Sequence, residues 1–221
     1  MTRRDTQEHL DLAGAVASAH PQSQLRLEGL RFLDRGPIDL TVEAGECVTL
    51  TGQSGSGKTL LLRAIADLDP HFGSAFSGEI ECAAVPAPEW RRRVGLLLAE
   101  SHWWRDSVGE HLRELAPDWL ERLGLAAEAL DWPTARLSTG ERQRLALLRL
   151  LSNRPHVLLI DESTANLDAE NTEKVEQLVA EYRLEAGAAV LWVTHDPVQA
   201  RRIGSRRYRL EDGRLVPELL E

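Results

Sequence analysis

Apolar residues recur along this chain of 221 residues with the spacing of β-strands. Residues 25–33, "LRLEGLRFL", alternate apolar and polar positions, which predicts a half-buried strand. Further strands are predicted within 36–52, on either side of a turn at 43–46, then at 77–85, 94–99, 156–161 and 188–196, and in a closing hairpin at 207–216 with Asp212 and Gly213 at its turn.

Helical spacing lies between these strands. A helix after residue 59 is predicted to present Leu61, Leu62, Ile65 and Leu68 on one face and to end near 69–70, since the residue before a proline resists helical geometry. Pro86 and Pro88 are expected to break the chain. Residues 107–151 are predicted to be helical, beginning with a capping box at 107–110. A later helix is indicated by Val175, Leu178, Val179 and Tyr182.

Strands alternating with helices predict an α/β fold, and the continuously apolar strands favour a parallel sheet covered on both faces. Residues 1–24 show no such pattern, so we interpret them as a flexible N-terminal tail or one frayed helix. Their short apolar run is interrupted by Asp11, which argues against a signal peptide. No apolar run approaches the about 18 residues that a membrane span requires.

Composition narrows the classes of function. The chain has 35 acidic and 26 basic residues, a formal net charge of −9, which disfavours a nucleic-acid partner. Cys47 and Cys82 are too few for a disulfide framework and are interpreted as reduced thiols in a cytosolic protein.

Residues 52–59, "GQSGSGKT", match the G-x-x-x-x-G-K-[ST] pattern of a phosphate-binding loop. The match lies between a predicted strand and a predicted helix, as that function requires. The loop comprises Gly52, Gln53, Ser54, Gly55, Ser56, Gly57, Lys58 and Thr59. Its backbone N–H groups can face one anion, Lys58 supplies a charge for the β- and γ-phosphates of ATP, and Thr59 supplies an oxygen for Mg²⁺.

A second motif, "VLLIDE" at 157–162, ends a predicted buried strand with two carboxylates. Asp161 is a candidate to hold Mg²⁺ through water. Glu162 is a candidate to polarise the attacking water, although a carboxylate near the start of a helix is also common without a catalytic role.

The stretch "LSTGERQR" at 137–144 predicts a capped helix start, in which Ser138 and Glu141 form a capping box. A stable helix needs nothing more. The small residues at this start leave room for a large anionic group to approach.

Together these motifs resemble the ATP-binding cassette (ABC) ATPase family over about 25–216, nearly the whole chain. "GQSGSGKT" is similar to the Walker A loop and "VLLIDE" to Walker B. Asp168 in "ANLD" resembles the D-loop aspartate, or is a helix N-cap. His195 in "VTHD" resembles the catalytic switch histidine that contacts the γ-phosphate. Phe32 falls where the family has an adenine-stacking aromatic residue, or is a core residue.

"LSTGERQR" resembles the signature sequence of the family. The resemblance implies a homodimer of two cassettes packed head to tail, in which each signature helix points its N-terminus at the γ-phosphate bound by the other subunit. Ser138, Thr139, Gly140 and Glu141 would then act in trans, with Thr139 in place of a usual glycine.

One position departs from the family. Its members carry a glutamine after the strand predicted at 94–99, and this chain has Ala99 there, followed by Glu100, which could substitute after a small shift of the loop. Trp103 and Trp104 follow, and adjacent aromatic residues in a loop suit a partner surface.

We therefore expect a P-loop NTPase (RecA-like) core, an N-terminal antiparallel β-subdomain and an α-helical subdomain at about 101–152, all within one ABC ATPase domain at 25–216. The resemblance implies an ATP- and Mg²⁺-dependent ATPase, peripheral on the cytoplasmic face of the inner membrane and docked on separate permease subunits. Small bacterial exporters of the iron-export type are the narrower match. A soluble ABC ATPase for cofactor assembly, and a cassette that binds ATP without turnover, remain alternatives.

Overall fold

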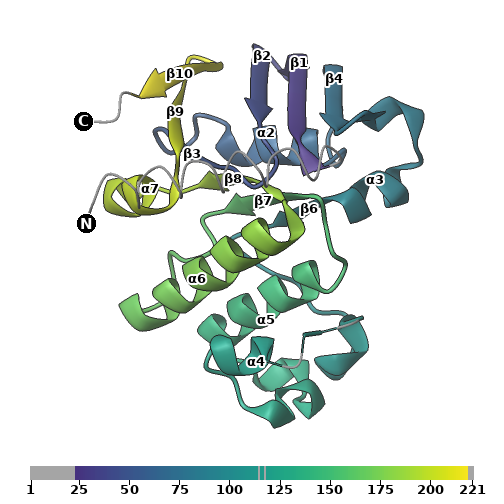
Figure 1. Ribbon diagram of the computed structural model, residues 1–221, viewed down its shortest axis with the longest axis vertical. Coiled ribbons are helices and arrows are strands. Elements are labelled where there is room, and N and C mark those ends of the chain that lie inside the picture. The colour runs from purple at the N-terminus through teal and green to yellow at the C-terminus, as the bar shows by residue number, and fades with distance from the viewer. Residues whose placement is uncertain (1–22, 114, 117, 219–221) are drawn as a thin grey trace, which may run out of the picture.

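The computed structural model describes residues 23–113, 115–116 and 118–218. Most of the predicted tail at 1–24 lies outside this part of the chain. Two sheets and the helices between and below them form the fold (Figure 1). The larger sheet has six strands in the order β10-β9-β3-β8-β7-β6, all parallel except β10. Its strands are β3 (Cys47–Thr51), β6 (Val94–Leu97), β7 (Val157–Asp161), β8 (Ala189–Val193), β9 (Arg206–Glu211) and β10 (Arg214–Glu218).

The smaller sheet is antiparallel and has the order β2-β1-β4-β5. Its strands are β1 (Leu25–Phe32), β2 (Arg35–Val42), β4 (Phe72–Ser77) and β5 (Ile80–Glu81). It stands above the end of the larger sheet in Figure 1, with α2 (Lys58–Ile65) between the two. The remaining α-helices are α3 (Ala87–Arg93), α4 (Trp119–Arg122), α5 (Thr139–Leu151), α6 (Ala169–Ala186) and α7 (Pro197–Ile203).

Alternate residues of the central strands face two separate cores. In β7, Val157 and Leu159 belong to the core that also contains β1, β2 and α2, whereas Leu158 and Ile160 pack with α5 and α6. All four are fully buried. A strand buried on both faces needs apolar residues at every position, which explains the continuous apolar runs of the sequence. The predicted P-loop NTPase class, with a parallel sheet and an added antiparallel sheet, is confirmed.

Four local predictions were wrong. The strand expected at 77–85 is limited to Ile80–Glu81 and is followed by a 3₁₀ turn at Cys82–Ala84, while β4 precedes it. Pro86 and Pro88 do not break the chain. Pro86 is the N-cap of α3 and Pro88 lies in its first turn, where the fixed φ of proline suits a helix. Leu68 is 42% exposed, since α2 ends at Ile65 and Asp67 takes a φ of +54°.

The fourth correction concerns 107–151, which is not one helical run. It holds the short α4, the long α5 and 3₁₀ turns at Gly109–His111, Ala127–Asp131 and Thr134–Arg136. The expected capping box at 107–110 is only half formed: the Ser107 N–H and Oγ donate to Glu110 Oε2 over 3.0 and 3.2 Å, but the 3₁₀ turn that follows has Val108 as its N-cap, without a side-chain cap bond. Local capping cannot extend a helix that Gly124, at φ +63°, and Pro133 interrupt. The bounds of a separate helical subdomain at 101–152 remain a prediction.

Candidate functional site

The phosphate-binding loop candidate, residues 52–57, joins the end of the central strand β3 to the start of α2. Gly55 and Gly57 have φ values of +77° and +103°, a left-handed geometry that residues with a Cβ rarely adopt. A Cβ added at Gly57 would also lie 2.7 Å from Nε of Arg35. Gly55 and Gly57 are therefore needed for the course of the loop.

Lys58 is folded over this loop. Its side chain is buried, and Nζ donates to the carbonyl oxygens of Gly52 (2.9 Å) and Gln53 (3.0 Å). Burial lowers the pKa of the ammonium group, and the nearby carboxylates of Glu162 and Asp161 oppose that shift. The ammonium group is thus held at the loop, next to the two acidic candidates.

Thr59 and Asp161 meet although they are 102 positions apart in the sequence. Thr59 Oγ1 donates to Asp161 Oδ2 over 2.7 Å. Asp161 is buried, and its other oxygen, Oδ1, has no hydrogen-bond partner among the described residues. Burial is the main cause that raises the pKa of this carboxyl. A hydroxyl beside a carboxylate oxygen without a partner fits the oxygen ligands that Mg²⁺ prefers.

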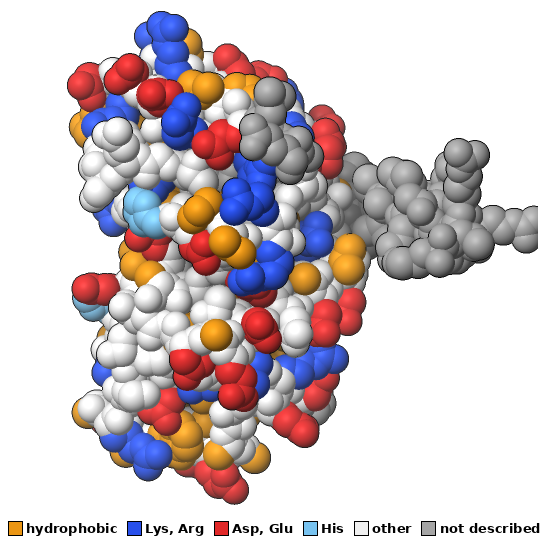
Figure 2. Space-filling model, turned by 90° about the vertical axis from the view of Figure 1, so that its left-hand side faces the viewer, with side chains coloured by type: hydrophobic (Ala, Val, Ile, Leu, Met, Phe, Trp, Pro, Cys, Tyr) orange, Lys and Arg blue, Asp and Glu red, His pale blue; other side chains and the backbone are white. Residues whose placement is uncertain are grey.

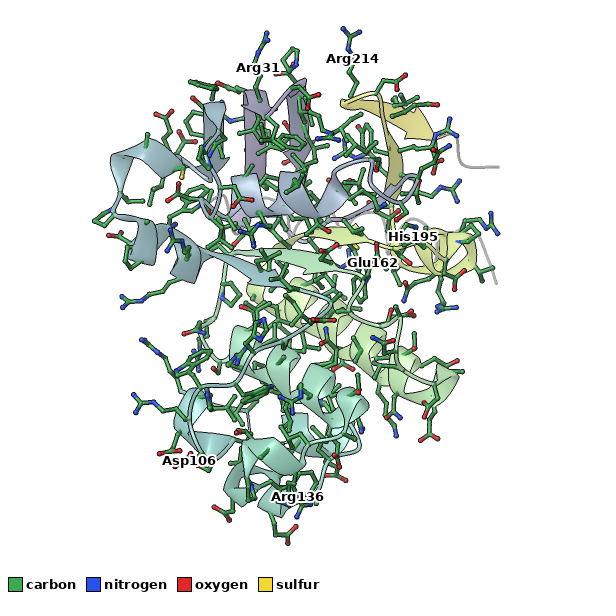
Figure 3. The ribbon with its side chains drawn as sticks, turned by 180° about the vertical axis from the view of Figure 1, so that it is seen from behind. Arg31, Asp106, Arg136, Glu162, His195 and Arg214 are labelled. Atoms are coloured by element: carbon green, nitrogen blue, oxygen red, sulfur yellow. The ribbon has the colours of Figure 1, made fainter. Side chains whose placement is uncertain are left out.

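Glu162 and His195 lie at hydrogen-bonding distance, with 2.6 Å between Oε1 and Nε2. Figure 3 shows the two side chains close together at the end of the larger sheet. The backbone N–H of Glu162 donates to the carbonyl of Val193 over 3.1 Å, and Glu162 adopts a φ of +48°, which is uncommon for a residue with a side chain. The two candidate catalytic residues are therefore placed by adjacent strands, β7 and β8.

The predicted capping box at the start of α5 is present. Glu141 N–H donates to Ser138 Oγ, and Glu141 Oε2 accepts from the Ser138 N–H over 2.9 Å. Ser138 and Thr139 are exposed, and a Cβ on Gly140 would be 3.4 Å from Leu167 Cδ2. The helix start is thus open to solvent and borders the "ANLD" segment. Its action in trans stays a prediction.

Asp168 is the N-cap of α6, with its carboxylate accepting from the Asn171 backbone N–H over 2.8 Å. This hydrogen bond is the main cause that lowers the pKa of Asp168. Asp168 thus has the capping role that the sequence left open, and the D-loop role remains a prediction.

Phe32 does not have the exposure that adenine stacking requires. Its side chain is 2% exposed and belongs to the core between the sheets. The alternative interpretation as a core residue is therefore correct. The neighbouring Leu33, 77% exposed, occupies the solvent side of this turn instead.

Ala99 and Glu100 are both exposed and lie just after β6. Gln143 of α5 donates from Nε2 to the Leu98 carbonyl over 3.0 Å, so the signature helix is bonded to this segment. Glu100 lines a cavity of about 440 Å³ together with Trp104 and Arg149. Whether Glu100 takes part in a metal site stays a prediction.

Two further residues of the site, Arg35 and Gln199, were not predicted from the sequence. Arg35 braces the phosphate loop from β2, with Nε donating to the Ser56 carbonyl over 3.0 Å. Gln199 is a buried residue of α7, a helix that was not predicted. Asp196 and Pro197 give the N-cap and N1 signals of that helix and could have revealed it.

Within the described residues, no helix is long and apolar enough to cross a membrane. On the face shown in Figure 2, Lys and Arg side chains are interspersed with Asp and Glu, so the described residues of this face form no continuous basic surface.

Comparisons with known proteins give a consistent result. A family model described as ABC transporter matches residues 36–165. The aliphatic sulfonates import ATP-binding protein SsuB of Pseudomonas entomophila is 37% identical over 204 residues, which cover 88% of this chain and 73% of that protein. A protein of the same description, SsuB 3 of Nocardia farcinica, is 38% identical over 212 residues, covering 93% of this chain and 83% of its own.

Among solved structures, the dimeric bacterial ABC transporter cassette MJ0796 matches with a TM-score of 0.74 and 25% identity, over 89% of this chain and 99% of that one. The same cassette has also been solved as a dimer with ADP and Pi.

These findings do not support the expected iron-export type, since both SsuB relatives are named as import proteins. The family itself is not in doubt, because the matched segment contains the phosphate loop, the signature and both Walker B carboxylates. The chain belongs to the ABC transporter family and is one of its ATP-hydrolysing subunits.

Proposed function

We propose that this chain binds ATP together with Mg²⁺ and hydrolyses it as two head-to-tail cassettes docked on separate membrane-spanning subunits. The observation that carries this proposal is the convergence of Lys58, the Thr59–Asp161 pair and the Glu162–His195 pair at one edge of the larger sheet. An edge where parallel strands end is where α/β folds bind ligands.

Each residue would have a distinct role. The backbone N–H groups of 52–57 and the Lys58 ammonium would bind the β- and γ-phosphates. Thr59 and Asp161 would hold Mg²⁺, which neutralises phosphate charge when bound. Glu162 would accept a proton from the attacking water, and His195 would contact the γ-phosphate while holding Glu162 in place. The exposed Ser138 and the Gly140 N–H would close the site from the second subunit.

A membrane partner is supported by the surface after β6. Trp104 is 69% exposed, the Arg149 guanidinium lies 5.0 Å from its ring centroid, and both side chains line the same cavity as Glu100. An exposed aromatic residue beside charged groups suits a protein interface. We place the chain at the cytoplasmic face of the inner membrane. The names of its relatives support an import system, with aliphatic sulfonates as the first substrates to test.

The tagged chain is expected to copurify from detergent-solubilised membranes with a multi-span membrane protein that raises its ATP turnover. Trp104→Asp should reduce both copurification and stimulation without changing the turnover of the isolated chain, because Trp104 is 69% exposed and its ring lies against His111 and Arg149, outside the phosphate loop. Trp132→Phe, a conservative change elsewhere in the same helical region, serves as the matched control. An active chain without any membrane partner would favour the soluble role in cofactor assembly.

Lys58→Ala is expected to abolish measurable ATP binding, because the loop would lose the ammonium group that balances the β- and γ-phosphate charge. Calorimetric titration with Mg²⁺-ATP measures the affinity directly. Lys174→Ala, which removes an exposed ion pair with Glu170 on α6, is the matched control and should bind ATP normally. Unchanged affinity in Lys58→Ala would contradict the assignment of the phosphate loop.

A further inference from the structure

A buried polar network lies directly behind the Glu162–His195 pair. Its central residue is Gln199 in the first turn of α7, whose side chain is 3% exposed. A buried amide needs hydrogen-bond partners for its oxygen and for both of its N–H groups. Gln199 finds all of them on three other segments of the chain.

The amide oxygen of Gln199 accepts from Thr194 Oγ1 over 2.6 Å. The amide nitrogen donates to Thr164 Oγ1 over 2.9 Å and to Glu176 Oε1 over 2.7 Å. Only one orientation of the amide places its nitrogen toward the carboxylate, so Glu176 determines which way Gln199 points.

The two threonines are the immediate neighbours of the catalytic candidates. Thr194 precedes His195, and its hydroxyl also accepts from the N–H of Asp196, the residue after the histidine, over 3.1 Å. This bond joins the residues on either side of His195. Thr164 follows Glu162 by two residues, in a turn where the Ala165 N–H donates to the Glu162 carbonyl over 3.1 Å. One amide therefore ties together the two backbone segments that carry Glu162 and His195.

The third partner connects the pair to α6. Glu176 is 7% exposed and accepts from Nε and one terminal nitrogen of Arg202, both over 2.7 Å. A carboxylate buried in this way is held by its bonds to the guanidinium and the amide. Because α6 begins at Ala169, directly after its N-cap Asp168, the network extends from the Glu162–His195 pair to the helix that follows the "ANLD" segment.

We infer that Gln199 is a positioning residue for ATP hydrolysis. It holds Glu162 and His195 at hydrogen-bonding distance through Thr164 and Thr194, and it fixes their place relative to α6 through Glu176. The inference rests on the proposed roles of Glu162 and His195. Gln199 itself touches neither of them and lies outside the phosphate loop.

Gln199→Leu keeps the approximate volume of the side chain and removes all three hydrogen bonds. We expect kcat to fall on the order of tenfold to a hundredfold, because small displacements of catalytic groups have effects of that size. KM for ATP should stay within about twofold, since the binding loop is unchanged. Gln177→Leu, an exposed glutamine of α6, is the matched control and should retain normal turnover. A normal kcat in Gln199→Leu, or a KM that rises as kcat falls, would overturn the inference.

Thr194→Val provides a second test that does not depend on the stability of Gln199→Leu, because it removes only the hydroxyl. Its kcat should also fall with little change in KM. The double variant should lose no more activity than Gln199→Leu alone, because both changes break the same connection. Independent, multiplying losses would contradict a path through Thr194.

Exchange of the two buried groups gives the most specific readout. Gln199→Glu places two carboxylates at a contact that is now 2.7 Å long, and turnover should fall. Adding Glu176→Gln restores one amide and one carboxylate at that contact and should recover turnover. If the wild-type chain is active but the double variant recovers no turnover, only the positioning role of Gln199 is contradicted. An inactive wild-type chain would contradict the proposed function as well.

Discussion

Glu162→Gln is expected to lower kcat for ATP hydrolysis by about 10²–10⁴-fold, while ATP still binds. The amide keeps the shape of the side chain and can still hydrogen-bond His195 Nε2, which now lies 2.6 Å from Oε1, but it cannot accept a proton from water. The chain should therefore accumulate as an ATP-bound dimer. Light scattering would show this as a doubling of mass that depends on ATP.

Adding Gly140→Asp to this variant should return it to a monomer. A carboxylate at the start of α5 would face the γ-phosphate of the other subunit, and two anions in a dry interface repel strongly. Gly140→Ala is the matched control. A Cβ at Gly140 makes only an ordinary contact of 3.4 Å with Leu167, so this change adds bulk without charge. With Glu162→Gln, it should leave a larger fraction of the chain dimeric than Gly140→Asp does. A double variant that stays dimeric with ATP would mean that "LSTGERQR" is a capped helix without a role in trans.

Trp90→Ala is expected to destabilise the fold by about 3–5 kcal/mol, as is typical when a large aromatic residue is removed from a core. Trp90 in α3 is fully buried between the sheets, and its indole N–H donates to the Ile65 carbonyl at the end of α2 over 2.8 Å. The substitution would remove packing area and also leave that carbonyl without its donor. Urea unfolding followed by circular dichroism measures the change in the free energy of unfolding.

The same substitution at an exposed tryptophan separates the effect of lost core packing from the effect of losing any tryptophan. Trp104→Ala should change the free energy of unfolding by less than about 1 kcal/mol, since this side chain is 69% exposed and its ring contacts are with His111 and Arg149 at the surface. If both substitutions lowered the free energy of unfolding equally, the burial of Trp90 would not be the cause of its effect.

The local features of the candidate site could be predicted from the sequence. The phosphate loop depends on glycines at fixed positions between a strand and a helix, and the Ser138–Glu141 capping box depends on residues three apart. The apolar runs of β7 and β8 report burial on both faces of a sheet. Each of these patterns extends over fewer than about ten residues, so local spacing contains all the information it needs.

Only the tertiary structure decided which segments far apart in the sequence contact one another. Alternation in β1 shows that one of its faces is buried, but not that Phe32 lies against the second sheet instead of a ligand. Nothing near Gln199 in the sequence indicates that its amide joins Thr164, Thr194 and Glu176, residues from 5 to 35 positions away. Such contacts depend on how the strands are ordered in the sheet and how α6 and α7 pack beneath it. Hydrophobic spacing identifies the buried face of an element, but it does not identify the partner that buries it.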